Sequence, residues 1–183
     1  MRARLILTAG IAAAAVVGSV FAASPASAQG VTFTLTGGVI SIAETSTAAA
    51  LTPAAGLAGQ TGTTVAGALG STTVTDNRAG VLGWQSKITG TTAFSNGTFT
   101  IPVTAATAFV PGTVSTSGVV AATQGTYLSA ATGLALTGSA QTLVTATAVV
   151  GNNTATFNPS LSIAVPGGAT AGDYVGAVTQ TVS

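Results

Sequence analysis

Few side chains in this chain of 183 residues could take part in chemistry, and their types decide which reactions are open to it. The chain has no histidine and no cysteine, so the commonest general base, the commonest transition-metal ligands and the thiol nucleophile are all missing. The acids are Glu44, Asp76 and Asp173, and nothing in their spacing predicts a carboxylate pair for glycosidic chemistry or a calcium-binding loop. We therefore predict a protein that is not an enzyme and that binds no cofactor.

Serine is abundant, but the sequence offers it no activating partner. Lys87 directly follows Ser86, and neighbouring residues on a strand point to opposite faces of a sheet. A Ser–Lys arrangement is therefore not expected from these two residues.

The N-terminal residues predict export. Arg2 and Arg4 precede an apolar stretch over residues 5–20, and Ala26-Ser27-Ala28 fits the small-x-small pattern that signal peptidase cleaves. The alternative is an uncleaved membrane anchor, but Pro25 interrupts a helix where it would have to continue. We expect residues 1–28 to be a signal peptide and residues 29–183 to form one secreted, extracellular domain.

The expected mature chain carries almost no charge. It keeps Arg78 and Lys87 against three acids, and charged residues make up only 4% of the full sequence, compared with about 25% in ordinary soluble domains. So few basic residues exclude nucleic acid as a partner. Gly, Thr and Ser interrupt every apolar run, so no membrane span is expected after cleavage. Because copies would barely repel one another, self-association stays open.

Alternating apolar and polar residues predict short strands along most of the chain. The expected strands cover residues 31–36, 39–43, 72–76, 83–90, 98–103, 107–110, 141–150, 158–165 and 173–182. Turn residues follow at 95–97, 151–153 and 166–168. Residues 119–138 fit either strands or an irregular crossover.

These strands predict an all-β fold, an antiparallel β-sandwich of the Ig-like or Greek-key type. Residues 46–70 are rich in Ala, Gly and Thr, and we expect them to form a long connection with at most one short element. No repeat of fixed period is visible, so a solenoid is not expected.

One segment, residues 73–88, concentrates the unusual residues. It contains the only tryptophan, Trp84, and both basic residues of the expected mature chain. Asp76 and Arg78 are expected to form an ion pair or a hydrogen-bonded turn, and Trp84 opens the next strand. Since Trp84 and Ile88 share one face of that strand, we expect Trp84 to be buried and Gln85 and Lys87 to point outward.

This segment resembles the WxL-domain proteins of Gram-positive cell surfaces, in which an Asp-x-Arg-like turn and a glycine precede a Gly-Trp pair. The chain also ends on a Tyr-led alternating strand, from Tyr174 to Ser183, similar to the closing strand of that family. Three positions differ: Ser86 stands where the first Leu is expected, and Gln180 and Val182 stand where the second Trp and Leu are expected. The resemblance implies a β-sandwich that associates non-covalently with peptidoglycan.

We therefore expect a secreted, non-enzymatic cell-envelope protein that is associated with the cell wall. Its partners would be a wall polymer or other surface proteins. The candidate wall-binding face consists of Asp76, Arg78, Trp84, Gln85 and Lys87. The alternative is a structural subunit of a surface layer or fibre that assembles with copies of itself. For Tyr174 we expect a sandwich-corner role, with its hydroxyl bonded to the backbone.

Overall fold

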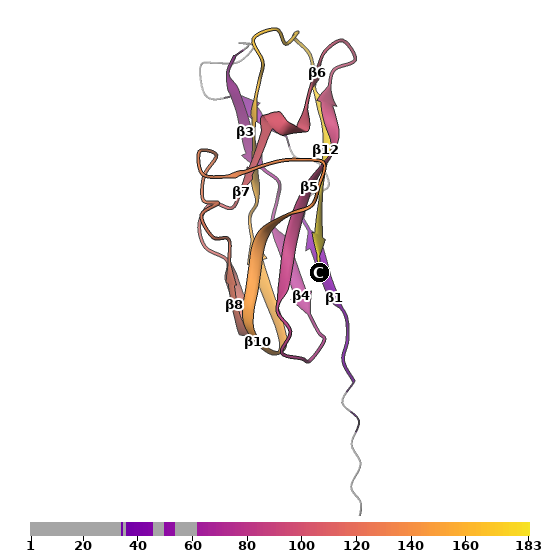
Figure 1. Cartoon of the computed structure of the whole chain (residues 1–183), viewed down its shortest axis with the longest axis vertical. Helices are drawn as coiled ribbons and strands as arrows, with labels where there is room; N and C mark the ends of the chain where they lie inside the picture. The colour runs from indigo at the N-terminus through magenta and orange to yellow at the C-terminus, as the bar shows by residue number, and fades with distance from the viewer. Residues whose placement is uncertain (1–33, 35, 46–49, 54–61) are drawn as a thin grey trace, which may run out of the picture. The chain divides into compact units, whose positions relative to one another are not determined.

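The structure is a computed structural model that describes residues 34, 36–45, 50–53 and 62–183 (Figure 1). All the strands described below belong to the unit from Leu35 to Ser183. The expected signal peptide and residues 31–33 and 35 of the first expected strand lie outside the described residues, and Thr36 is in no strand.

The described part of the chain is all-β, as the sequence predicts. It contains twelve strands and one short 3-10 helix, η1 (Val103–Ala105). The strands are β1 (Ile40–Glu44), β2 (Thr52–Pro53), β3 (Thr64–Ala68), β4 (Thr72–Asp76), β5 (Trp84–Ser95), β6 (Thr100–Ile101), β7 (Ala106–Phe109), β8 (Ser115–Thr123), β9 (Leu134–Ala135), β10 (Gln141–Phe157), β11 (Ser160–Ala164) and β12 (Val175–Val182).

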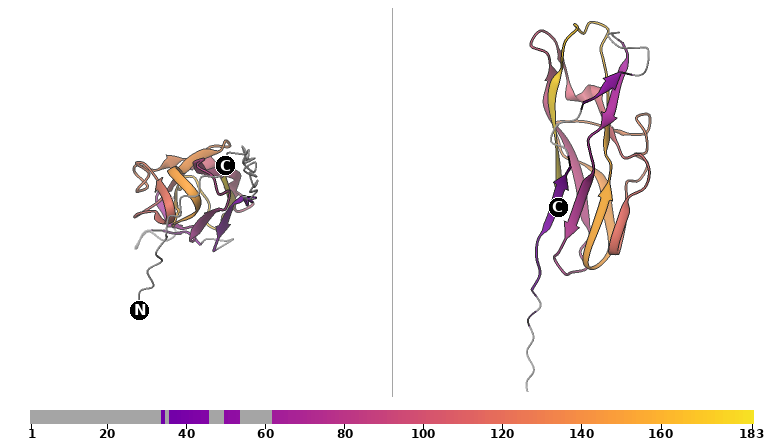
Figure 2. Two further views of the ribbon diagram at one scale, coloured as in Figure 1. Left: turned by 90° about the horizontal axis from the view of Figure 1, so that it is seen from below. Right: turned by 180° about the vertical axis from the view of Figure 1, so that it is seen from behind.

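The strands form two antiparallel sheets (Figures 1 and 2). The larger sheet has the order β1-β4-β10-β5-β12, with β8 added beside β10 and β6 beside β5. The smaller sheet has the order β2-β3-β11-β7-β9. Antiparallel sheets around one core confirm the predicted fold class, while the Ig-like or Greek-key type stays a prediction.

The larger sheet is organised around β10, its longest strand. The first part of β10 pairs with β5, from Gln141 opposite Ile88 to Ala146 opposite Trp84. The last part pairs with β4, where Asn153 lies opposite Asp76. Strand β8 follows the other edge of β10, with interruptions of register near its middle.

The bend of β10 lies between these two parts. Ala148 and Gly151 have positive φ angles of 52° and 68°, a region that an alanine rarely occupies. We predicted a turn at residues 151–153, which would end the strand. The strand does not end there: β10 continues to Phe157, because β8 and the β4–β5 loop remain hydrogen-bonded to it on both sides of residues 151–153.

The apolar face of the larger sheet lies in one core. Val74 of β4, Ile88 of β5 and Phe157 of β10 are all buried in one core cluster. The amide of Gln180 on β12 donates to Thr72 Oγ1 on β4 at 3.2 Å, although these two strands are not paired. In residues 72–76 and 84–88, buried and half-buried side chains alternate, so one face of each strand points into the core, as predicted.

Two glycine-rich stretches were misjudged. Residues 46–70 contain two strands, β2 and β3, rather than one short element at most. β3 hydrogen-bonds along β11, but its small residues hide the alternation. We expected β5 to end at Gly90, whereas it continues to Ser95. A Cβ at Gly90 would lie 2.7 Å from the Cβ of Val103, so this glycine allows close packing instead of ending the strand.

The segment from 119 to 138 combines both alternatives left open by the sequence. It contains most of β8, then turns, and then the two-residue strand β9. The expected turn at residues 95–97 is confirmed, because the backbone amides of Thr98 and Phe99 donate to Asn96 Oδ1.

Ser86 generates the first prediction, because its hydroxyl is buried without a partner. It is fully buried between Trp84 and Ile88, and among the described residues its Oγ is the one buried side-chain oxygen or nitrogen without a hydrogen bond. Ser86→Ala should raise the free energy of unfolding by about 1 kcal/mol, because it removes an unsatisfied hydroxyl and leaves almost no cavity.

Chemical denaturation followed by circular dichroism measures this change. Ser41→Ala on exposed strand β1 is the matched control, and its effect should stay within about 0.5 kcal/mol. A clear loss of stability in Ser86→Ala would show that the hydroxyl has a partner, such as a buried water.

Candidate functional site

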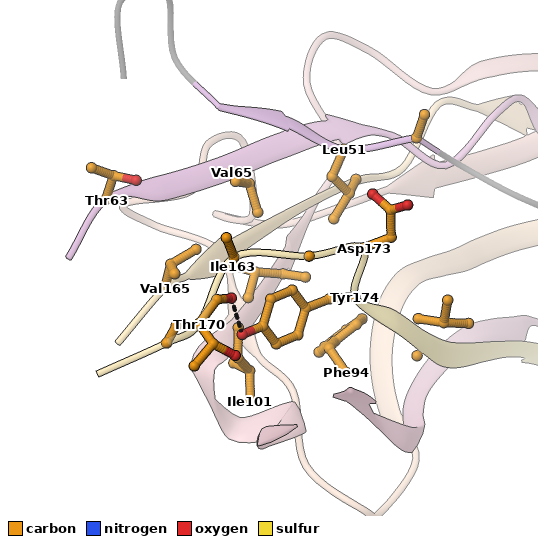
Figure 3. A pocket seen from close by; sticks show the side chains of 16 residues that line it. Leu51, Thr63, Val65, Phe94, Ile101, Ile163, Val165, Thr170, Asp173 and Tyr174 are labelled. Atoms are coloured by element: carbon orange, nitrogen blue, oxygen red, sulfur yellow. Dashed lines mark hydrogen bonds between the residues drawn. The ribbon is translucent and has the colours of Figure 1, made fainter. Parts of the chain in front are cut away.

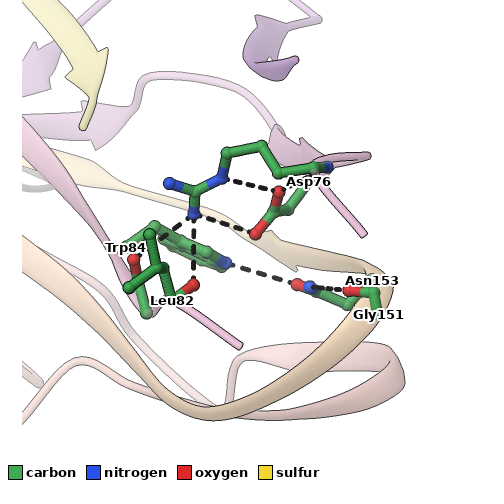
Figure 4. Close-up of polar contacts among 7 residues, drawn as sticks. Asp76, Leu82, Trp84, Gly151 and Asn153 are labelled. Carbon is green, nitrogen blue, oxygen red and sulfur yellow. Dashed lines mark hydrogen bonds and ion pairs between the residues drawn. The ribbon is translucent and has the colours of Figure 1, made fainter. Parts of the chain in front are cut away.

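The predicted pairing of Asp76 with Arg78 forms at the end of β4 (Figure 4). Nε and Nη2 of Arg78 donate to the two carboxylate oxygens of Asp76, each at 2.9 Å. The backbone amide of Arg78 donates to Oδ1 of the same carboxylate at 3.0 Å. Only 2% of the Asp76 side chain is exposed, compared with 29% of Arg78. The pair therefore places one charge in the interior and its counter-ion at the surface.

Arg78 also holds the loop that joins β4 to β5. Its Nη2 donates to the carbonyl oxygens of Leu82 at 3.2 Å and Gly83 at 3.3 Å. The backbone amide of Gly151 on β10 donates to the Gly80 carbonyl at 2.8 Å. The loop is thus fixed from inside by a side chain and from one flank by β10.

These hydrogen bonds set the pKa of both charged groups. The hydrogen bonds from Arg78 hold the pKa of Asp76 below its ordinary value of 3.8, against the opposing effect of burial. The carboxylate in turn raises the pKa of Arg78 above its ordinary value. Asp76 is therefore held as a carboxylate, and nothing here gives it the pKa of a general acid.

Trp84 is buried, as its position on β5 predicts. Its side chain is 2% exposed, and its Nε1–H donates to Oδ1 of Asn153 at 3.3 Å. Asn153 is itself buried and donates from Nδ2 to the Gly151 carbonyl at 3.1 Å. The indole therefore stabilises the bend of β10 and is not available as a platform for a sugar (Figure 4).

The five candidate wall-binding residues do not share one exposed face. Gln85 and Lys87 are half-buried and lie on the face of β5 opposite Trp84, as predicted. Gln85 Oε1 accepts a hydrogen bond from Thr142 Oγ1 at 3.1 Å. Of the five, Arg78, Gln85 and Lys87 are the members that remain partly accessible to a partner.

Beside the Asp76–Arg78 pair, the structure shows a group of exposed apolar residues that the sequence did not predict. Among the described residues, seven large apolar side chains are exposed, and five of them gather at this bend. We call these five the apolar tip: Val39, Val81, Leu82, Val119 and Val150.

Backbone pairing brings the tip residues together. Val119 and Val150 are partners across β8 and β10. Val81 follows Gly80, whose carbonyl is bonded to Gly151, the neighbour of Val150. The Val39 carbonyl accepts from Asn77 at the end of β4. They were missed because the sequence places them in four separate segments.

An apolar pocket lies at the other end of β5 (Figure 3). Its volume is about 620 Å³, within the range of small-molecule sites. The lining includes Leu51, Val65, Phe94, Ile101, Ile163 and Tyr174. The hydroxyl of Tyr174 donates to the Thr170 carbonyl at 2.8 Å, so the backbone bond expected for this tyrosine is confirmed.

The described residues show no arrangement for metal chemistry, and comparison with known proteins adds no assignment. Within this part of the chain, no three His, Cys, Asp or Glu side chains lie close enough to hold a metal ion. No helix among the described residues is long and apolar enough to cross a membrane. The chain was compared with family models, with curated proteins and with solved structures, and none of them matches it.

The second prediction tests the structural role of Trp84. Trp84→Ala should lower the free energy of unfolding by about 3–5 kcal/mol, because it empties a buried site and leaves Asn153 Oδ1 unpaired. Trp84→Phe keeps most of the apolar contact and should cost less. Both changes remove the only tryptophan, so denaturation must be followed by circular dichroism. A loss below about 1 kcal/mol in Trp84→Ala would contradict the buried role.

The third prediction concerns acid. Because the folded pKa of Asp76 lies below its ordinary value of 3.8, its contribution to stability is complete above that value. The contribution declines as the pH falls further, and it is lost below the folded pKa. The free energy of unfolding should therefore drop as the pH falls below about 4, and Asp76→Asn should show a smaller drop over the same range. Asp173→Asn, at an exposed position, should keep the wild-type drop.

Proposed function

We propose that this chain is an exported, non-enzymatic structural subunit of the cell envelope that assembles with copies of itself. The observation that supports this function best is the apolar tip, where the exposed large apolar side chains of the fold concentrate at one bend. Exposed apolar groups on a surface mark contacts with other molecules when they gather in one place. Scattered single residues would not carry the same meaning.

The low charge of the chain supports the same function. Only 4% of the residues are charged, so copies approach one another with little electrostatic repulsion. Strand β8 adds a second uncharged surface, because seven of its nine residues are exposed and its only strand partner among the described residues is β10. Such strands are common sites of contact between chains.

Association with the cell wall is the second candidate, and the partly exposed cations favour it. Arg78 and Lys87 are the basic residues of the expected mature chain, and both are accessible enough to contact an anionic or sugar-rich polymer. The resemblance of residues 73–88 to WxL domains supports the same partner. The burial of Trp84 weighs against it, because wall polymers would have to bind without stacking on the indole.

The fourth prediction separates the two functions. The cleaved protein, from Gln29 onward, should form assemblies that grow with protein concentration in sedimentation velocity. An apolar contact should persist or strengthen in high salt, whereas binding of a wall polymer by Arg78 and Lys87 should weaken. In parallel, the protein is mixed with purified peptidoglycan and pelleted. A protein that remains monomeric but pellets with the wall would replace the proposed function by the second candidate.

A further inference from the structure

The apolar tip and the apolar pocket occupy opposite ends of the same strand. Leu82 of the tip lies two residues before β5, and Phe94, in the lining of the pocket, is near its other end. At about 3.3 Å per residue, the ten steps from Trp84 to Phe94 separate the two ends by roughly 30 Å. Within the described unit, Figure 1 shows the β4–β5 loop and the bend of β10 near one end of β5, and β6 near the other. The two surfaces therefore cannot meet within one chain.

We propose that the apolar tip of one copy enters the apolar pocket of the next, so that copies join head to tail. This inference rests on the proposed self-association and names its contact surfaces. A patch that fits a pocket elsewhere on the same molecule makes a heterologous contact. Such a contact leaves a free tip at one end and a free pocket at the other, so further copies add to both ends.

The tip is held in position before it binds. Arg78 bonds the carbonyls of Leu82 and Gly83, and Asp76 fixes the guanidinium in turn. Gly80 is bonded to β10 on the flank. A loop fixed in this way loses little conformational entropy on association, which favours binding through Val81 and Leu82. Both side chains point away from the core, with exposed fractions of 73% and 70%.

The pocket matches the tip in size and chemistry. Its volume of about 620 Å³ exceeds that of one leucine side chain, so a loop tip can enter. Its lining is mainly aliphatic and aromatic, and Tyr174 is turned into it with its hydroxyl already bonded (Figure 3). Asp173 is the one charged residue in the lining. Val175, 74% exposed, also borders the pocket.

The fifth prediction uses one variant for each surface of the mature full-length chain. Leu82→Asp puts a negative charge on the tip, which both the apolar lining and Asp173 would oppose in the pocket of the next copy. Val175→Asp puts a negative charge beside the pocket and leaves the tip intact. Both positions are exposed, so each variant should keep the wild-type melting temperature. Each should weaken self-association at least about tenfold, as the loss of one buried apolar side chain does. Leu82→Lys should weaken it less than Leu82→Asp, because its charge is opposite to that of Asp173.

Mixing the two aspartate variants provides the decisive measurement. The intact tip of Val175→Asp should enter the intact pocket of Leu82→Asp, so the mixture should form a dimer that neither variant forms alone. Sedimentation velocity detects this dimer. Leu128→Asp is the matched control, because Leu128 is exposed but lies in neither surface, and it should associate like the wild type.

The remaining outcomes separate this inference from the function on which it rests. A wild-type chain that stays monomeric overturns both. A wild-type chain that associates, together with variants that associate equally well, overturns the head-to-tail contact and leaves self-association standing. Dimers of Val175→Asp alone, with none from Leu82→Asp, would show a symmetric tip-to-tip contact and would also overturn it.

Discussion

The ion pair between Asp76 and Arg78 is the interaction on which the bend of the larger sheet depends. A buried carboxylate is costly unless each oxygen is bonded, and here the guanidinium and a backbone amide supply those bonds. The same guanidinium satisfies two loop carbonyls that no strand partner reaches. The pair therefore closes the β4–β5 loop and directs the chain back along β10. Trp84 then enters the core beside Asn153, which fixes the bend from the opposite strand.

This arrangement divides structural and surface roles between neighbouring residues. Trp84, the only tryptophan, and Asp76, one of three acids, are buried and stabilise the loop. The commoner residues Val81 and Leu82 lie between them in sequence and are exposed. The sequence motif pointed to Asp76 and Trp84 as binding residues, whereas the structure exposes Val81 and Leu82 instead. The resemblance to WxL domains is compatible with this division, because the resembling residues are those that shape the turn.

The predictability of the fold follows from the range of the interactions involved. Alternation over residues 72–76 and 84–88 identifies the buried faces correctly, since apolar side chains on a strand tend to point into the core and polar ones outward. The Asp76–Arg78 turn and the Asn96 turn are local and were also predictable. The bend within β10 was not, because Gly151-Asn152-Asn153 ends a strand by local rules but is held in pairing by β8 and the β4–β5 loop. β3 was missed for a similar reason, since its pairing with β11 rather than its composition makes it a strand.

The tip and the pocket illustrate the same limit for function. Each is assembled from segments far apart in the sequence, and no one of these segments differs from ordinary strand or loop composition. In the proposed head-to-tail contact, the length of β5 separates the two surfaces within one chain, and the low charge leaves little long-range repulsion between copies. In that contact electrostatics would contribute little to the choice of partner, and shape and apolar area would have to determine it. A rigid loop favours such a contact, because ordering a flexible loop on binding costs conformational entropy, which would offset much of the free energy of the apolar contact. The buried Asp76–Arg78 pair would supply this rigidity without adding net charge to the proposed contact surface.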